Sequence, residues 1–196
     1  MKIELAGLDK IGAVDGPCVY IANHMSTLET LVLPGIVQPV KDVTFIVKRG
    51  IIEYPIFKHV MLVRDPIVVD RVNPREDLQV VMSHGAEILK SGRSLIVFPQ
   101  TTRTFQFEPE RFNTIGVKLA RRAGVPVVPV AVKSDAWTNG RVVKEFGKID
   151  VSKVVHLEFG DALHIQDRGA EEHRAIIDYI SERLETWSAL DETPGR

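Results

Sequence analysis

Two short polar stretches carry the residue types that could do chemistry in this sequence. NHMSTLET (residues 23–30) places His24 five positions before Glu29, and PQTTR (residues 99–103) ends in Arg103. A histidine can take a proton from a hydroxyl group near neutral pH, and a carboxylate on its other ring nitrogen fixes the tautomer. A strand end that leads into a helix would bring His24 and Glu29 together.

A second interpretation of NHMSTLET needs no catalysis. Ser26 and Glu29 have the spacing of a capping box, in which the two residues hold the start of a helix. Ser26 is not surrounded by the G-x-S-x-G sequence of a hydrolase nucleophile. The spacing alone therefore leaves both interpretations of Glu29 open.

Three cationic side chains follow apolar runs that we expect to be strands. They are Lys48, Arg71 and Arg103, and an arginine can bind a phosphate through two parallel hydrogen bonds. Each could equally be a solvated charge in a surface ion pair, for example with Asp70 or Glu108. The sequence therefore leaves open whether these three cations form an anion-binding site or surface ion pairs.

Short apolar runs that alternate with helical patterns predict the elements that position these residues. We expect strands at residues 18–22, 44–47, 67–69, 94–98, 125–132 and 154–159, and helices after NHMST, at 74–91, at about 113–123 and at about 170–188. In parallel α/β sheets, sites lie beyond the carboxyl ends of strands, which is where both polar stretches fall. The order predicts an α/β fold, a single domain over residues 1–196 with a mostly parallel central sheet flanked by helices.

Prolines and caps refine this prediction. Asn73 is expected to cap the helix that begins at Pro74. Pro34 is expected to end or bend the helix after NHMST. The two prolines of residues 125–132 predict an edge strand or an irregular extension, because proline donates no ladder hydrogen bond. The apolar stripe of the last helix predicts core packing.

Composition excludes some classes of protein. The formal net charge of -1 argues against a nucleic-acid-binding protein with a broad basic face. The single cysteine, Cys18, forms no intramolecular disulfide and is expected to be a buried apolar residue in a reducing compartment. No apolar run is long enough to predict a membrane-spanning helix or a signal peptide. We therefore expect a cytoplasmic protein that meets membranes only at their surface.

Four blocks, in order, resemble the glycerolipid acyltransferase family, whose best-known members acylate lysophosphatidic acid to phosphatidic acid. NHMSTLE is similar to the family's Asn-His-x-Ser-x-x-Asp, and FPQTTRT to Phe-Pro-Glu-Gly-Thr-Arg-Ser. VPVVPVAV is similar to Val-Pro-Ile-Val-Pro-Val. The second block along the chain, VKRGIIEYPIFKHVMLVRDPIVVDR, ends at Arg71 and is similar to the family's lysine-to-arginine block. The resemblance covers roughly residues 16–165.

The resemblance implies direct acyl transfer from an acyl thioester, on coenzyme A or acyl carrier protein, to a hydroxyl of a lysophospholipid such as 1-acylglycerol-3-phosphate. His24 would be the general base, and Glu29 would orient its imidazole. No metal or resident cofactor is expected, because the thioester is already activated. The fourth block, VPVVPVAV, would line the acyl path. The resemblance assigns substrate binding to Asn23, Ser26, Lys48, Arg71, Gln100, Thr101, Thr102 and Arg103, the cations holding the anionic head of the acceptor.

Three residues depart from the family's pattern. Glu29 is one methylene longer than the family's Asp, Gln100 lacks the charge of the family's Glu, and Thr101 is bulkier than the family's Gly. The changes at 100 and 101 lie in the block that handles the acceptor. They leave two alternatives, an anionic-lipid-binding protein with weakened catalysis and an acyl-thioester hydrolase.

The resemblance also implies work at the inner face of a membrane. The apolar N-terminal helices that the family often carries are not found in this sequence. We therefore expect membrane contact from loops, from residues 51–61, which include Tyr54 and Phe57, or from a partner.

Overall fold

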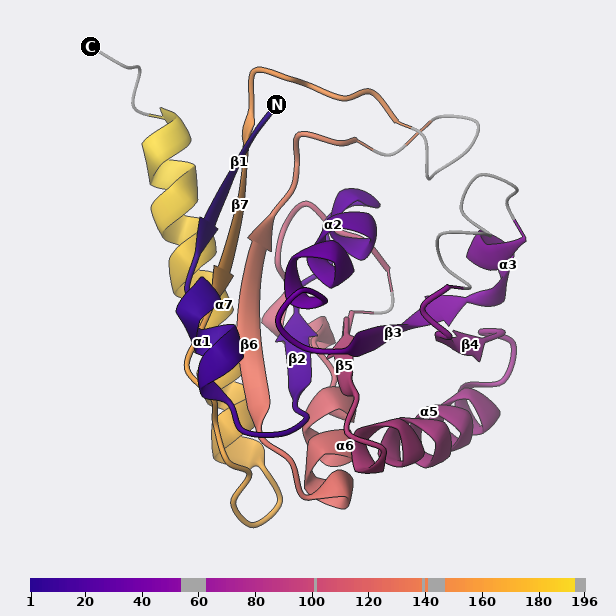
Figure 1. Ribbon diagram of the computed structural model, residues 1–196. Helices are drawn as coiled ribbons and strands as arrows, with labels where there is room; N and C mark the ends of the chain where they lie inside the picture. Colours follow the sequence, from indigo (N-terminus) through magenta and orange to yellow (C-terminus); the bar gives the residue numbers. More distant parts are fainter. Residues whose placement is uncertain (54–62, 101, 139, 141–146, 193–196) are drawn as a thin grey trace.

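A seven-stranded sheet forms the centre of the protein, with the strand order β1-β7-β6-β2-β5-β3-β4 (Figure 1). The computed structural model describes residues 1–53, 63–100, 102–138, 140 and 147–192. The strands are β1 (Lys2–Ala6), β2 (Val19–Ala22), β3 (Val43–Lys48), β4 (Ile67–Val69), β5 (Ser94–Val97), β6 (Val127–Lys133) and β7 (Val154–Phe159). The helices are α1 (Leu8–Ala13), α2 (Leu28–Val37), α3 (Arg49–Ile52), α5 (Pro74–Lys90), the 3-10 helix η1 (Pro109–Arg111), α6 (Ile115–Ala123) and α7 (Ala170–Glu192).

The sheet is mostly parallel, as predicted. β2 pairs in parallel with β5 and β6, and β3 pairs in parallel with β5 and β4. β7 is antiparallel to β6, and β1 is parallel to β7. The carboxyl ends of β2, β3, β4, β5 and β6 therefore lie along one edge, which is where a site is expected.

Alternate residues of each central strand pack into two apolar layers. In β2, Tyr20 and Ala22 face the layer of α1 and α2, whereas Val19 and Ile21 face the layer of α5, α6 and α7. Burial on both faces explains why these strands read as continuous apolar runs in the sequence. The longer helices cover the two faces, and the short α3 follows the carboxyl end of β3 directly (Figure 1).

The helix predictions are largely confirmed. The Asn73 side chain accepts a hydrogen bond from Arg75 N at 3.1 Å and caps α5. The last helix, α7, buries Ile176, Ile180 and Trp187 in the core, as its apolar stripe predicted. Among the described residues, no helix combines the length and the apolar character needed to cross a membrane.

The prediction that residues 125–132 form an edge strand is wrong, because β6 lies between β7 and β2. Proline has no N–H to donate, and Pro129 is tolerated there because its nitrogen lies on the side of the strand that faces the end of β7. The Pro129 carbonyl accepts a hydrogen bond from Gly160 N at 2.8 Å, and the ladder with β7 begins only at the next pair, Val130 with Phe159. A residue's N–H and C=O point to the same side of a strand, so the parallel ladder with β2 loses no donor.

Two further sequence predictions have different outcomes, and two elements were not predicted. α2 does not end at Pro34 but continues to Val37, because Leu33, Pro34 and Val37 are all buried against the sheet. β1 and α1 were not predicted, since every residue of β1 is exposed and no burial alternation marks the strand. Of the segment expected to contact a membrane, residues 54–61 lie outside the described residues, and Ile51 and Ile52 pack partly buried beside the core.

Candidate active site

His24 and Glu29 form a hydrogen-bonded pair at the carboxyl end of β2. His24 lies just beyond the strand, and Glu29 lies in the first turn of α2. Nδ1 of His24 is 2.9 Å from Oε1 of Glu29. The Glu29 side chain is fully buried, whereas 17% of the His24 side chain is exposed. The longer Glu29 therefore reaches the imidazole in this fold, and His24 remains open to solvent.

Four further hydrogen bonds hold the Glu29 carboxylate. Oε1 accepts from Met25 N at 2.6 Å and from Ser26 N at 2.7 Å. Oε2 accepts from Ser26 Oγ at 2.8 Å and from Ser134 Oγ at 2.6 Å. Burial opposes the charge of this carboxylate, but the bonds from His24, Ser134 and the Ser26 backbone outweigh that effect and lower the pKa of Glu29 below its usual 4.5. The residue is therefore held as an anion.

The hydrogen bonds expected from both interpretations of NHMSTLET are present together in this structure. Glu29 accepts the Ser26 backbone N–H, and the Ser26 hydroxyl accepts a hydrogen bond from Leu28 N at 3.1 Å, as a capping pair does. The same carboxylate also bonds to His24. The start of α2 therefore places the carboxylate that the imidazole contacts.

The His24 imidazole is oriented on its other side by an aromatic contact. Its ring is stacked on Phe98, with the ring centroids 4.6 Å apart and the planes at 25°. An ionised carboxylate only accepts hydrogen bonds, so Nδ1 of His24 carries the proton toward Glu29. In the neutral imidazole, Nε2 is then the unprotonated ring nitrogen, which is the form that a general base requires.

Gln100 holds the main chain of His24. Its Oε1 accepts the His24 N–H at 2.7 Å, and its Nε2 donates to Thr104 Oγ1 at 2.8 Å. Thr104 N in turn donates to the His24 carbonyl at 3.0 Å. Gln100 is buried, and these partners fix the orientation of its amide. The altered residue of the FPQTTRT block thus ties the loop after β5 to the end of β2.

Asn23 connects β2 to β6 beyond the last ladder pair. Its side-chain amide donates to the Val132 carbonyl at 2.7 Å and accepts from Val132 N at 2.8 Å. Asn23 is buried. Both polar atoms of its amide are therefore engaged by the strand that carries the VPVVPVAV block.

The three predicted cations lie at the ends of neighbouring strands. Arg103 follows β5, Lys48 ends β3 and Arg71 follows β4. The Arg103 guanidinium donates to the hydroxyl of Thr27, which lies between the two residues of the histidine–glutamate pair. Lys48 and Arg71 are exposed. Asp70 pairs with Arg49, and Glu108 pairs with Arg111 at 2.9 Å.

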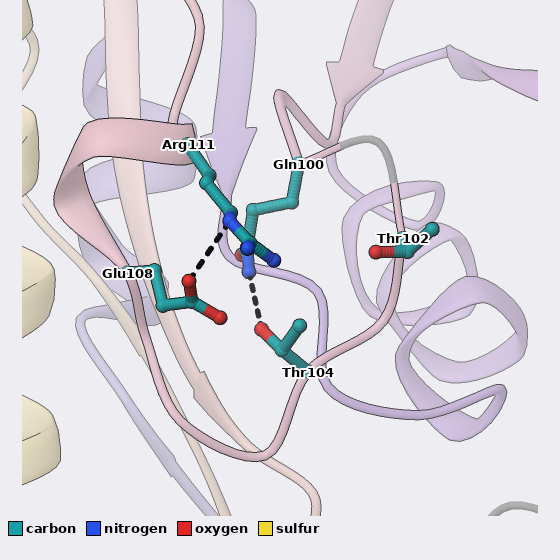
Figure 2. A pocket seen from close by; sticks show the side chains of 5 residues that line it. All are labelled: Gln100, Thr102, Thr104, Glu108 and Arg111. Atoms are coloured by element: carbon teal, nitrogen blue, oxygen red, sulfur yellow. Dashed lines mark hydrogen bonds and ion pairs between the residues drawn. The ribbon is translucent and has the colours of Figure 1, made fainter.

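A small polar cavity lies beside Gln100. It has a volume of about 220 Å³. Figure 2 shows the Gln100 and Thr104 side chains joined by a hydrogen bond, with the ion pair of Glu108 and Arg111 beside them. Thr102 also lines the cavity and is exposed. Thr101 lies outside the described residues.

A larger groove of about 970 Å³ lies between the loop before η1 and helix α7. We call it the α7 groove. Met25, the neighbour of His24, lines it together with apolar side chains such as Phe107 and Leu184, and Lys133 and Lys153 add charge. Its lining is Met25, Phe105, Gln106, Phe107, Pro109, Lys133, Asp135, Thr138, Lys153, Ser181, Leu184, Glu185, Ser188 and Asp191.

Sequence reasoning placed the central pair but missed two of its partners, Ser134 and Thr104. Both follow strands at the carboxyl edge of the sheet, so the rule that selected His24 could have selected them. No group of three or more His, Cys, Asp or Glu side chains in the described part of the chain is placed to hold a metal ion. The roles assigned to the site residues stay predictions.

Comparison with known proteins identifies the family. The family model described as Acyltransferase matches residues 2–133. The 1-acyl-sn-glycerol-3-phosphate acyltransferase of Pseudomonas aeruginosa is 32% identical over 188 residues, which cover 95% of this chain and 67% of that protein. The chain therefore belongs to the acyltransferase family, as its four blocks predicted, and is an enzyme of that class.

Other relatives agree in name. A chloroplastic 1-acyl-sn-glycerol-3-phosphate acyltransferase of Brassica napus is 31% identical over 131 residues, covering 67% of this chain and 37% of that protein. The crystal structure of the 1-acyl-sn-glycerophosphate (LPA) acyltransferase PlsC from Thermotoga maritima shares the fold, with a TM-score of 0.70, 20% identity, and coverage of 100% of this chain and 74% of that one. The chain is thus shorter than each of these relatives.

Proposed function

We propose that this protein transfers a fatty acyl group from an acyl thioester to a hydroxyl of a lysophospholipid-type acceptor such as 1-acylglycerol-3-phosphate. The observation that carries the proposal is the 2.9 Å contact between His24 and Glu29 in a chain of the acyltransferase family. The names of its relatives support the acceptor class. The donor is acyl-coenzyme A or acyl carrier protein loaded with an acyl chain.

The contact between His24 and Glu29 suits one direct transfer. The acceptor hydroxyl attacks the thioester carbonyl carbon while Nε2 of His24 takes the hydroxyl proton. The ionised Glu29 carboxylate then stabilises the imidazolium through Nδ1. When the C–S bond breaks, the leaving thiolate takes the proton from Nε2, which gives the acylated lipid and a free thiol. No acyl-enzyme is formed.

The cations at the carboxyl edge would bind the anionic head of the acceptor. Arg103 has the strongest support, because its contact with Thr27 places it beside the pair of His24 and Glu29. Lys48 ends β3, Arg71 follows β4, and both residues are exposed. An arginine can hold a phosphate with two hydrogen bonds, which would fix the orientation of the acceptor.

The α7 groove is the candidate path for the acyl chain. Its volume of about 970 Å³ falls in the range of about 300–1,000 Å³ that is common for small-molecule sites. Its lining includes Met25, the residue after His24, and the apolar side chains of Phe107 and Leu184. A bulky substitution there, Leu184→Trp, should lower turnover more with long acyl chains than with short ones. The acyl path along VPVVPVAV predicted from the resemblance is a separate hypothesis.

We further propose that the reaction takes place at the inner membrane face, with the protein bound peripherally in the cytoplasm. A lysophospholipid acceptor resides in the bilayer, so the carboxyl edge of the sheet would have to face the lipid surface. Vesicles that contain lysophosphatidic acid should therefore pull down the protein more than vesicles of uncharged lipid alone. Equal recovery with both kinds of vesicle would contradict this part of the proposal.

The experiment that tests the function is a product panel. The protein is incubated with acyl-coenzyme A or acyl-loaded carrier protein and several lysolipids, and the lipids are measured by mass spectrometry. Acylated lysophosphatidic acid is the expected product, and it should disappear when acceptor is omitted. No acylated lipid with any acceptor would refute the proposal.

The same panel separates the two alternatives. Free fatty acid without acylated lipid would identify a thioester hydrolase. Anionic-lipid binding that weakens in Arg103→Ala, without turnover of any donor, would identify a lipid-binding protein with weakened catalysis. The intact hydrogen bonds around His24 and Glu29 favour an enzyme over the lipid-binding alternative, and the names of the relatives favour the transferase over the hydrolase.

A further inference from the structure

Ser134 joins the histidine–glutamate pair from a distant part of the chain. Its hydroxyl donates to Oε2 of Glu29 at 2.6 Å, although the two residues are 105 positions apart. Ser134 is fully buried, as is the Glu29 side chain. Ser134 lies directly after β6 and belongs to none of the four blocks.

The register of the sheet fixes where Ser134 lies. Val130 and Val132 of β6 face the layer that contains α2. Because side chains alternate along an extended chain, Ser134 continues that face toward the start of α2. The two hydrogen bonds between Asn23 and Val132 hold β6 against the end of β2 at this level. The position of Ser134 against Glu29 is therefore set by the fold on both sides.

A glutamate needs such a partner more than a shorter carboxylate does. Glutamate has one more rotatable side-chain bond than aspartate, and its terminal torsion has a broad energy profile, so the position and plane of the carboxylate are not fixed by rotamer preference alone. Ser26 Oγ and Ser134 Oγ both bond to Oε2, at 2.8 Å and 2.6 Å. With Oε2 held, Oε1 remains directed at Nδ1 of His24.

We propose that Ser134 is a positioning residue of this acyltransferase, acting through Glu29 to keep the His24 proton on Nδ1 and Nε2 free to accept a proton. The inference rests on the proposed function of His24 as general base. Ser134 does not touch the reacting atoms. Its loss leaves Glu29 buried with the Ser26 hydroxyl as the remaining donor to Oε2, so the carboxylate plane is held less firmly against the imidazole, although Met25 N and Ser26 N still bond to Oε1.

Two variants test the role of Ser134 against a matched control. Ser134→Ala removes the donor, and Ser94→Ala removes another fully buried hydroxyl, which accepts the Cys18 N–H at 3.1 Å at the opposite edge of the sheet. In Ser134→Ala we expect kcat to fall roughly 10- to 100-fold, the value of one hydrogen bond to a charged group, with both KM values within about twofold. Ser94→Ala should keep kcat within about twofold.

A spectroscopic measurement separates positioning from stability. ¹⁵N NMR of the histidine rings reports the tautomer of His24, whose signals are assigned by their loss in His24→Ala. The native protein should show Nδ1 protonated and Nε2 unprotonated, and Ser134→Ala should show a mixture of the two tautomers. Ser134→Cys, of similar size with a weaker donor, should be intermediate in kcat and carries the test if Ser134→Ala does not fold.

Either of two outcomes would contradict the proposed role of Ser134. They are an unchanged kcat with an unchanged His24 tautomer in a folded Ser134 variant, or an equal fall of kcat in Ser94→Ala. The NMR measurement needs no substrate. If the native protein turns over no acceptor, the proposed function fails, while the tautomer comparison still decides whether Ser134 positions the pair.

Discussion

The backbone N–H of His24 donates to the side-chain oxygen of Gln100 at 2.7 Å, which joins the loops after β2 and β5. The family's glutamate is replaced at this position, and the replacement keeps the acceptor that the His24 backbone uses. The amide also supplies a donor for Thr104. Gln100 therefore holds the main chain of the proposed base directly.

The first prediction concerns this bond. Gln100→Leu leaves the buried His24 N–H without its acceptor and should lower the free energy of unfolding by about 1–3 kcal/mol, with a fall in kcat. Gln100→Glu keeps an oxygen acceptor and should retain kcat within about threefold. Urea unfolding and steady-state kinetics measure the two effects. Equal kinetics for both variants would show that the bond does not position His24.

The second prediction concerns the length and the charge of Glu29. Glu29→Gln keeps the length but removes the charge that stabilises the imidazolium, and kcat should fall at least about 10²-fold. Glu29→Asp keeps the charge but is too short to hold the partners on both carboxylate oxygens, so its kcat should lie between those of Glu29→Gln and the native protein. A Glu29→Gln variant with native kcat would exclude a catalytic role for the charge.

The third prediction concerns acid stability. The pKa of Glu29 is lowered in the folded protein, because the bonds from its neighbours outweigh burial, so the unfolded chain binds the extra proton as pH falls. The stabilisation from ionised Glu29 is present above the unfolded pKa, near 4.5, and is lost as pH falls through the folded pKa. The difference in unfolding free energy between the native protein and Glu29→Gln should therefore shrink below about pH 4.5. A difference that grows on acidification would indicate a raised pKa.

The fourth prediction concerns Arg103. Arg103→Ala should raise KM for lysophosphatidic acid roughly 10- to 100-fold and change KM for the acyl donor little, because a charged hydrogen bond to the acceptor is lost. The matched control is Arg121→Ala, an exposed arginine in the last turn of α6, at the opposite end of the sheet from the site. A rise in KM for the donor as large as that for the acceptor would argue against a role in head-group binding.

The elements of the fold that bury apolar side chains on both faces could be predicted from the sequence. β4 has the predicted bounds, because an uninterrupted apolar run is typical of a buried strand. β7 also has the predicted bounds, although His156 and Glu158 interrupt its apolar run. β1 could not be predicted in this way, since the exposed edge strand gains its place from hydrogen bonds to β7 and not from burial. The central place of β6 depends on which side Pro129 faces, which is a property of the assembled sheet.

The contacts of the candidate site also differ in how far they could be predicted from the sequence. The contact between His24 and Glu29 is local, five positions along the chain, and its residue types made it predictable. Ser134 and Gln100 reach the pair from other strands, 105 and 76 positions away from their partners. Contacts of this range follow from strand order and register, which a single sequence does not contain.

The most direct test of the account is the turnover of His24→Ala. Acylated product from acyl-coenzyme A and lysophosphatidic acid is measured by mass spectrometry, beside the native protein and His84→Ala, which changes an exposed histidine on α5. If His24 is the general base, its variant should be folded and lose at least about 10²-fold in turnover, while His84→Ala stays within about twofold. A folded His24→Ala protein with native turnover would contradict the mechanism.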